Sequence, residues 1–202
     1  MNDNLLKLAP TKYRPGLIDL IWVAFMAYGL LMGLADQPKS FFYGLAFGLI
    51  IALLRRWGIN RPLILWLAAM SVFQLVGEAA GWYQFVPNFD KVVHTLFPII
   101  GSLVAYAVLV RFGLLPRPTS FNDRHPRFTL ALTVFLLAVA GGALWEIIEF
   151  SGDQSHLFSG PIQLGNFDTM TDIIATFVGG VISGPLAIRI WYKHKEPSTR
   201  RL

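Results

Sequence analysis

The chain contains no cysteine and few charged residues. Of its 202 residues, 14% are Asp, Glu, Lys or Arg, whereas 54% are hydrophobic. The absence of cysteine excludes disulfides, thiolate metal sites and cysteine nucleophiles. The low charge does not fit the polar surface of a soluble domain. With a mean hydropathy of +0.53, the composition indicates an integral membrane protein.

Six apolar runs are long enough to cross a bilayer. A membrane-spanning helix needs about 20 mostly apolar residues, and charged, proline or glycine clusters separate runs of about that length. The runs predict helices over residues 17–34, 41–57, 62–82, 89–112, 128–150 and 169–192. No repeat or soluble segment stands apart from them. We therefore expect residues 1–202 to form one all-α domain, a polytopic membrane helix bundle of six transmembrane helices.

The basic residues lie on one side of this predicted bundle. If the six helices alternate in direction, all 17 lysines and arginines except Lys39 and Lys91 fall on the side of the two termini. Membrane proteins retain Lys and Arg on the cytoplasmic side, so both termini are predicted to be cytoplasmic. Lys39 is expected to extend to the lipid headgroups. The net charge of +5 then reflects topology and does not indicate a nucleic-acid partner.

The acidic residues gather on the opposite, outer side. They close or open the predicted helices there, or follow in the loop that also holds His156: Glu78, Asp90, Glu146, Glu149, Asp153, Asp168 and Asp172. Residues three or four apart share a helix face. Three pairs therefore each point in one direction: Asp90 with His94, Glu146 with Glu149, and Asp168 with Asp172. Because intramembrane carboxylates turn toward the bundle interior, we expect these pairs to converge.

The chemistry of this cluster favours a divalent cation. Lys91 alone cannot neutralise the acids, and a metal ion, shared protons or both would offset the excess charge. Carboxylates with one imidazole suit Mg²⁺, Mn²⁺, Zn²⁺ or Ca²⁺. The candidate metal ligands are Asp90, His94, Glu146, Glu149, Asp168 and Asp172. Glu146, Glu149 and His94 are also the candidate catalytic residues, with one carboxylate as general base for an attacking water.

A simpler interpretation covers part of the cluster. Acids in the first turn of a helix interact favourably with its dipole, which would account for Asp90, Asp168 and Asp172 at the headgroup level. It does not account for Glu146 and Glu149, which close a predicted helix at the end where the dipole disfavours negative charge.

Other polar and small residues predict contacts between helices. Gln74 is expected to form an interhelical hydrogen bond or to extend the polar site inward, and Asp19 to cap a turn or pair with Arg14. Glycines spaced by four residues predict close helix packing within the chain, with a homodimer through the same faces as the alternative. These pairs are Gly29/Gly33, Gly44/Gly48, Gly77/Gly81 and Gly180/Gly184.

Three segments carry a resemblance to a known family. They are GEAAGWYQFVPNFDKVVH at 77–94, ALWEIIEF at 143–150 and FDTMTDIIATFVGG at 167–180. Over about residues 60–190 the chain resembles the YjdF-like bacterial inner membrane proteins, whose pattern places D-x-x-x-H, E-x-x-E and D-T-x-x-D in this order. It is distantly similar to VanZ-like proteins, which share the D-K-x-x-H opening and are linked to glycopeptide resistance. The resemblance implies a multi-pass inner-membrane location, and the six candidate ligands occupy the motif positions.

Three classes of function remain open at this point. The first is a metal-dependent hydrolase or transferase acting at the outer leaflet on a lipid or lipid-linked envelope precursor. The second is a proton- or metal-coupled transporter or binding protein. It would need polar residues across the membrane, where the inner halves of the last three helices are nearly all apolar apart from Ser102, Thr129, Thr133 and Ser183. The third is a non-catalytic membrane assembly subunit. Membrane lipids are expected partners in each.

Overall fold

The described part of the chain consists of helices and no strand. The computed structural model describes residues 16–118, 124–155 and 165–192. Within them lie α1 (Leu17–Leu34), α2 (Pro38–Arg56), α3 (Arg61–Ala79), α4 (Trp82–Phe85), α5 (Phe89–Arg111), α6 (Pro126–Gln154) and α7 (Asn166–Tyr192). The six long helices are each long and apolar enough to cross a membrane. The predicted all-α, multi-pass architecture is confirmed, whereas the cytoplasmic placement of the termini stays a prediction.

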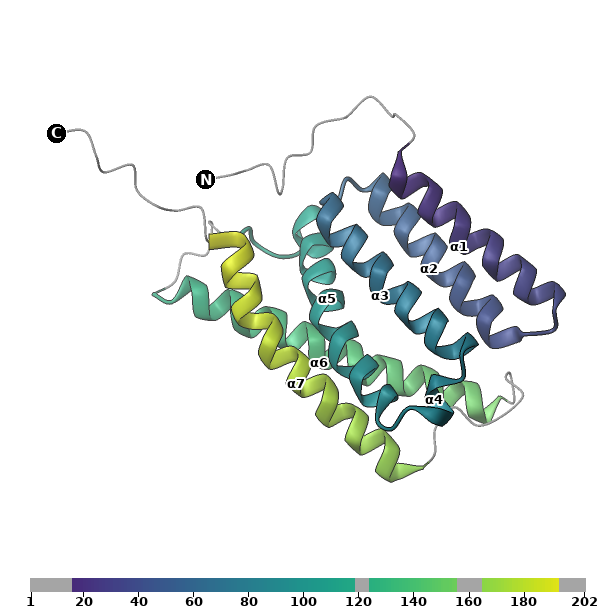
Figure 1. Cartoon of the computed structure of the whole chain (residues 1–202). Coiled ribbons are helices and arrows are strands. Elements are labelled where there is room, and N and C mark those ends of the chain that lie inside the picture. The colour runs from purple at the N-terminus through teal and green to yellow at the C-terminus, as the bar shows by residue number, and fades with distance from the viewer. Residues whose placement is uncertain (1–15, 119–123, 156–164, 193–202) are drawn as a thin grey trace.

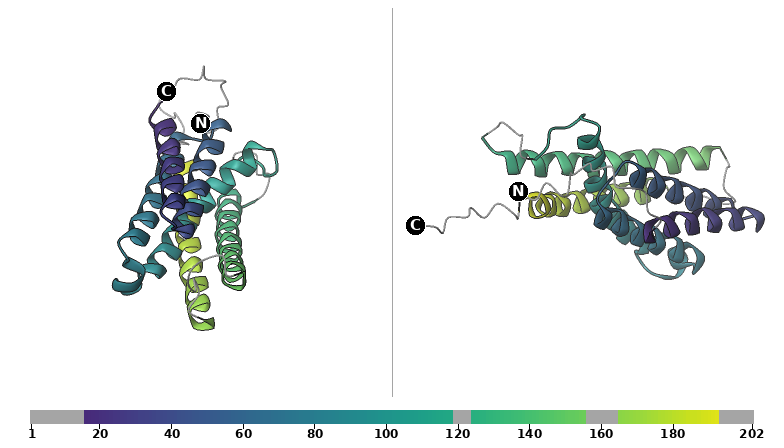
Figure 2. Two further views of the ribbon diagram at one scale, coloured as in Figure 1. Left: turned by 90° about the vertical axis from the view of Figure 1, so that its right-hand side faces the viewer. Right: turned by 90° about the horizontal axis from the view of Figure 1, so that it is seen from above.

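The helices form two groups that meet at α5. α1, α2 and α3 lie side by side, α7 lies on the other side of α5, and α6 passes behind α5 (Figure 1). α5 contacts α3, α6 and α7, so it joins the two groups. In both views of Figure 2, α6 lies along one side of the molecule. We call the end of the bundle at which α5 and α7 begin the acidic end, because the acidic residues predicted to converge lie there.

The apolar core lies between the two groups of helices. Ile51 of α2, Ile64 of α3 and Leu103 of α5 are at most 1% exposed. The outward faces are also apolar, as Leu136 of α6 and Val181 of α7 illustrate with more than half of their surface exposed. Apolar residues on both the inner and the outer faces are expected of helices that contact lipid chains.

Glycines allow several of these helices to approach closely. A Cβ on Gly44 of α2 would lie 2.6 Å from the Cα of Gly29 on α1. A Cβ on Gly179 of α7 would lie 2.3 Å from the carbonyl oxygen of Thr95 on α5. Gly179 lies outside the predicted pairs, but the pairs Gly29/Gly33, Gly44/Gly48 and Gly180/Gly184 also face a neighbouring helix, so packing within the chain is confirmed for them. Gly81 lies instead in the turn before α4, and the homodimer stays a prediction.

Four helix ends differ by three or more residues from those predicted, and one of them is the start of α7 at Asn166 rather than residue 169. α2 begins at Pro38 rather than residue 41, since proline suits a first helical turn. α3 ends at Ala79 rather than residue 82, because Gly81 adopts a left-handed conformation with φ of 70° and starts α4. α6 continues to Gln154, so Glu146 lies two turns inside it. Glu149 likewise lies more than one turn before the end of α6. The prediction that the helix dipole disfavours these two glutamates is therefore wrong, because the effect fades beyond the last turn.

Gly179→Ala is expected to destabilise the protein, because the added Cβ would collide with the Thr95 backbone, which no side-chain rotation can move. We expect a loss of about 1–3 kcal/mol in the free energy of unfolding. Gly141→Ala on α6 is the control, since a Cβ there meets nothing within 4 Å. Thermal unfolding in detergent, followed by circular dichroism, measures both variants. Equal midpoints would contradict the close approach of α5 and α7.

Candidate functional site

The three predicted pairs converge at the acidic end of the bundle. α5 supplies Asp90 and His94, α6 supplies Glu146 and Glu149, and α7 supplies Asp168 and Asp172. Short contacts join α5 to α6 through His94 and join α5 to α7 through Lys91. Whether these residues bind metal or act in catalysis stays a prediction. His156 lies outside the described residues.

Lys91 lies among three aspartates. Its Nζ is 3.0 Å from Asp90 Oδ2, 2.6 Å from Asp168 Oδ1 and 2.7 Å from Asp172 Oδ1. An ammonium group carries three N–H donors, so one lysine can serve all three carboxylates. Asp172 is 2% exposed, and a carboxylate buried to that degree needs such a partner. The aspartates of α5 and α7 are thus held together by a cation of the chain itself.

His94 lies between two carboxylates at distances longer than hydrogen bonds. Its Nδ1 is 3.4 Å from Glu146 Oε1, and its Nε2 is 3.6 Å from Asp90 Oδ1. N–H···O hydrogen bonds measure about 2.7–3.2 Å, and a neutral imidazole has one N–H to donate. His94 and Glu146 are each 6% exposed. A neutral imidazole can therefore direct its N–H toward only one of the two carboxylates.

Five of the six candidate ligands fall into two groups that could hold a metal ion. In one group, ligand atoms of Asp90, His94 and Asp172 lie within 4.8 Å of one another, and in the other those of His94, Glu146 and Glu149 do. Asp168 belongs to neither group within the described residues. Lys91 already contacts two aspartates of the first group. The group of His94, Glu146 and Glu149 is therefore the better suited of the two to a metal ion.

Packing across α5, α6 and α7 holds His94 in place. Thr176 of α7 donates a hydrogen bond of 3.3 Å to the carbonyl oxygen of His94. Gly142, one turn before Glu146 on α6, makes room for Thr176, since a Cβ there would lie 2.3 Å from its methyl group. Trp145 donates a hydrogen bond of 2.8 Å from Nε1 to Glu149 Oε1. The half-buried Glu149 is thus oriented by its own helix.

Sequence reasoning missed Lys39 as a member of the site. Lys39 was expected to extend to the headgroups, but its Nζ lies 3.0 Å from Glu78 Oε2. The sequence places Lys39 and Lys91 as the two bases on the acidic side, but it does not identify Glu78 as the partner of Lys39. Both lysines pair with acids of the cluster. Glu78 thereby joins the site as the partner of Lys39, a role that the three-pair pattern did not predict.

Gln74 forms the interhelical hydrogen bond that the sequence predicts. Its Oε1 accepts a hydrogen bond of 2.5 Å from the hydroxyl of Tyr83 on α4. Burial, reinforced by the neighbouring Tyr43 and the charges of Asp90 and Glu78, raises the pKa of the Tyr83 phenol above its ordinary value. The phenol therefore stays protonated and keeps donating to Gln74.

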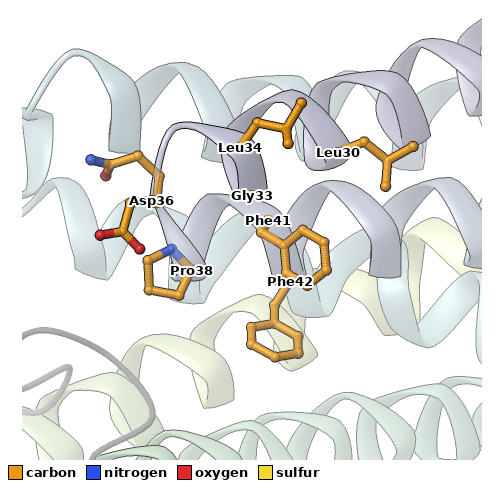
Figure 3. Close-up of a pocket in the computed structure, with 8 residues that line it drawn as sticks. Leu30, Gly33, Leu34, Asp36, Pro38, Phe41 and Phe42 are labelled. Carbon is orange, nitrogen blue, oxygen red and sulfur yellow. The ribbon is translucent and has the colours of Figure 1, made fainter.

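An apolar groove lies elsewhere, at the tip of the hairpin formed by α1 and α2 (Figure 3). Its volume is about 640 Å³, and its lining includes Leu30, Leu34, Phe41 and Phe42. None of the six candidate ligands lines it, so the groove does not belong to the carboxylate cluster.

Comparisons with known proteins agree with a membrane protein and name no activity. The family model of a predicted membrane protein, DUF2238, matches residues 17–194. An uncharacterized protein of Thermotoga maritima is 28% identical over 120 residues, which are 59% of this chain and 58% of that protein. No solved structure matches the chain. The matching family and the matching protein are not named YjdF or VanZ, so the resemblance to those two families stays a prediction.

Lys91→Met is expected to destabilise the fold, because it leaves three carboxylates without their shared ammonium group. Removing one partner of a buried ion pair typically costs about 3–5 kcal/mol. Lys91→Arg should lose less, since it keeps the charge. Arg61→Met, at an exposed position, is the control for losing a positive charge. Unfolding in detergent measures the differences.

The loss of stability in Lys91→Met should shrink at acid pH, because protonated carboxyl groups need no cation. A loss that does not change with pH would contradict this.

Proposed function

The chain belongs to the DUF2238 family of predicted membrane proteins, and we propose that it holds a divalent metal ion between His94, Glu146 and Glu149. The distance between His94 Nδ1 and Glu146 Oε1 supports this site most directly. Two ligands bonded to one ion at about 2.0–2.1 Å with tetrahedral angles lie roughly 3.3 Å apart. The observed 3.4 Å matches that spacing and exceeds a hydrogen bond.

The charge balance at the acidic end also supports a metal ion. Six carboxylates of the described residues gather there with two lysines: Glu78, Asp90, Glu146, Glu149, Asp168 and Asp172 with Lys39 and Lys91. Excess negative charge between membrane-spanning helices is costly, and a divalent ion would offset part of it. Two carboxylates and one imidazole suit Mg²⁺, Mn²⁺, Zn²⁺ and Ca²⁺.

We propose that the acidic end faces outward from a bacterial inner membrane and that the site serves hydrolysis or transfer on a lipid or lipid-linked envelope substrate. The cluster lies near the ends of helices long enough to span a membrane, which supports a location at the depth of lipid headgroups, where labile ester bonds are. A bound metal would polarise such a bond. Glu149 is more exposed than Glu146, so we propose that it binds the metal through one carboxylate oxygen and accepts a proton from an attacking water on the other.

A transport role receives less support from the described residues. An ion path needs polar groups that continue across the membrane, and the hydroxyls toward the other end bond to their own helices. Ser102 donates to the carbonyl of Ile99, Thr133 to that of Thr129, and Ser183 to that of Gly180. These hydroxyls satisfy backbone acceptors and line no described path. A non-catalytic assembly subunit is the remaining alternative, for which cluster substitutions would act through misfolding.

Metal content tests the proposed site. Detergent-purified wild type is expected to carry about one divalent ion per chain by elemental mass spectrometry, and Glu146→Gln/Glu149→Gln should lose at least tenfold in affinity, because both substituted residues are ligands. Asp168→Asn is the control, since it alters the same cluster outside both metal groups. The variants are compared at matched thermal stability. Equal metal in all three proteins, or none after loading with each of the four ions, would overturn the proposal.

Activity is tested separately on the metal-loaded protein. Reconstituted wild type should process an outer-leaflet phospholipid or lipid-linked precursor, followed by lipid mass spectrometry, and Glu149→Gln should slow turnover by about 10²–10⁴-fold, the usual contribution of a general base. Ser151→Ala is the control and should retain turnover, because Ser151 is exposed and its hydroxyl donates to the carbonyl of Ile147 in the same helix. Bound metal without turnover on any such lipid would favour a binding or transport role.

A further inference from the structure

Two tyrosine rings and a carboxylate surround an ammonium group at the acidic end. The Nζ of Lys39 lies 3.0 Å from Glu78 Oε2, 5.9 Å from the ring centroid of Tyr43 and 5.4 Å from that of Tyr83. Both ring distances fall within the roughly 6 Å range of cation–π contacts. Aromatic faces together with a carboxylate are the combination that recognises ammonium groups of ligands. We call Glu78, Tyr43 and Tyr83 the ammonium site.

Groups other than Lys39 hold the two rings in place. The hydroxyl of Tyr83 donates to Gln74, which is 5% exposed. The ring of Tyr83 packs edge-on against that of Phe89, with 4.9 Å between the ring centroids. The ring of Tyr43 stacks on Phe47 and on Trp145, each at 6.0 Å. The ammonium site would therefore keep its shape if another cation replaced that of Lys39.

Lys39 is suited to such an exchange. It lies in the first turn of α2, on a flexible side chain that is 28% exposed, opposite a Glu78 side chain that is 20% exposed. Replacing its ammonium by that of a ligand leaves the charge of the ammonium site unchanged. The displaced Lys39 is then stabilised by an anion nearby, because a lysine at the membrane surface pairs favourably with a phosphate. A ligand with both an ammonium and a phosphate group meets both needs.

We propose that the ammonium site binds the headgroup of a zwitterionic phospholipid, with the lipid ammonium on Glu78, Tyr43 and Tyr83 and the displaced Lys39 on the lipid phosphate. Tyr43 stacks on Trp145, whose indole donates to Glu149, so the ammonium site adjoins the residues of the proposed metal site. Headgroup binding requires no metal and can be measured without one. It therefore stands or falls independently of the proposed function.

Lipid selectivity of the metal-free wild type tests the proposal. Protein treated with a chelator is equilibrated with phosphatidylethanolamine or phosphatidylglycerol of identical acyl chains, and bound lipid is counted by native mass spectrometry. We expect about a fivefold preference for phosphatidylethanolamine, in line with one cation–π site. Glu78→Gln and Tyr83→Leu should abolish the preference. Phe85→Leu, on the same short helix but 82% exposed, should retain it. Equal binding of the two lipids by the wild type would overturn the proposal.

Lys39→Ala provides a second test with a small probe. It leaves Glu78 facing an empty ammonium site, so ethylammonium chloride should raise the unfolding midpoint of this variant above that in equal sodium chloride. The double variant Lys39→Ala/Glu78→Gln is the control and should show no such rise. An unfolding midpoint of Lys39→Ala that does not rise with ethylammonium chloride would count against the site. If free ethanolamine saturates the wild type and no lipid preference is found, the ligand is a soluble amine and the lipid assignment is wrong. Should Lys39→Ala not fold, the lipid comparison with Tyr83→Leu decides.

Discussion

A carboxylate between membrane-spanning helices needs a cation, a proton or a hydrogen-bond donor beside it, because little water is there to solvate it. Much of the acidic end follows from this requirement. Lys91 draws α5 and α7 together by contacting aspartates on both, and Lys39 joins α2 to α3 through Glu78. Each lysine thus serves the fold as well as the charge balance of the site.

The remaining contacts of the site depend on how closely the helices approach. Gly142 admits Thr176, which reaches the backbone of His94, and Gly179 brings α7 against the backbone of Thr95. These glycines set the distance between α5, α6 and α7. The 3.4 Å separation of His94 and Glu146 is a consequence of that packing. The distance between His94 and Glu146 exceeds a hydrogen bond by only a few tenths of an ångström. A methyl group added at one of these glycines would move the helices by a similar amount.

An aromatic wall connects the two parts of the acidic end. Tyr43 contacts Lys39 on one side and Trp145 on the other, and Trp145 orients Glu149. The ammonium site and the proposed metal site therefore share rigid rings. The two proposals therefore concern neighbouring parts of the acidic end, and each can be measured without the other.

The sequence by itself determined the membrane class, the six long helices and the gathering of acids at one end, because apolar length and helical spacing are properties of neighbouring residues. It also predicted that Asp90, His94 and Glu146 converge. It could not predict that Lys39 reaches Glu78, that α6 extends past Glu149, or that Lys91 serves three aspartates. Those features depend on distances between helices far apart in the chain, and only tertiary packing, set by close glycine contacts and ion pairing, decides them.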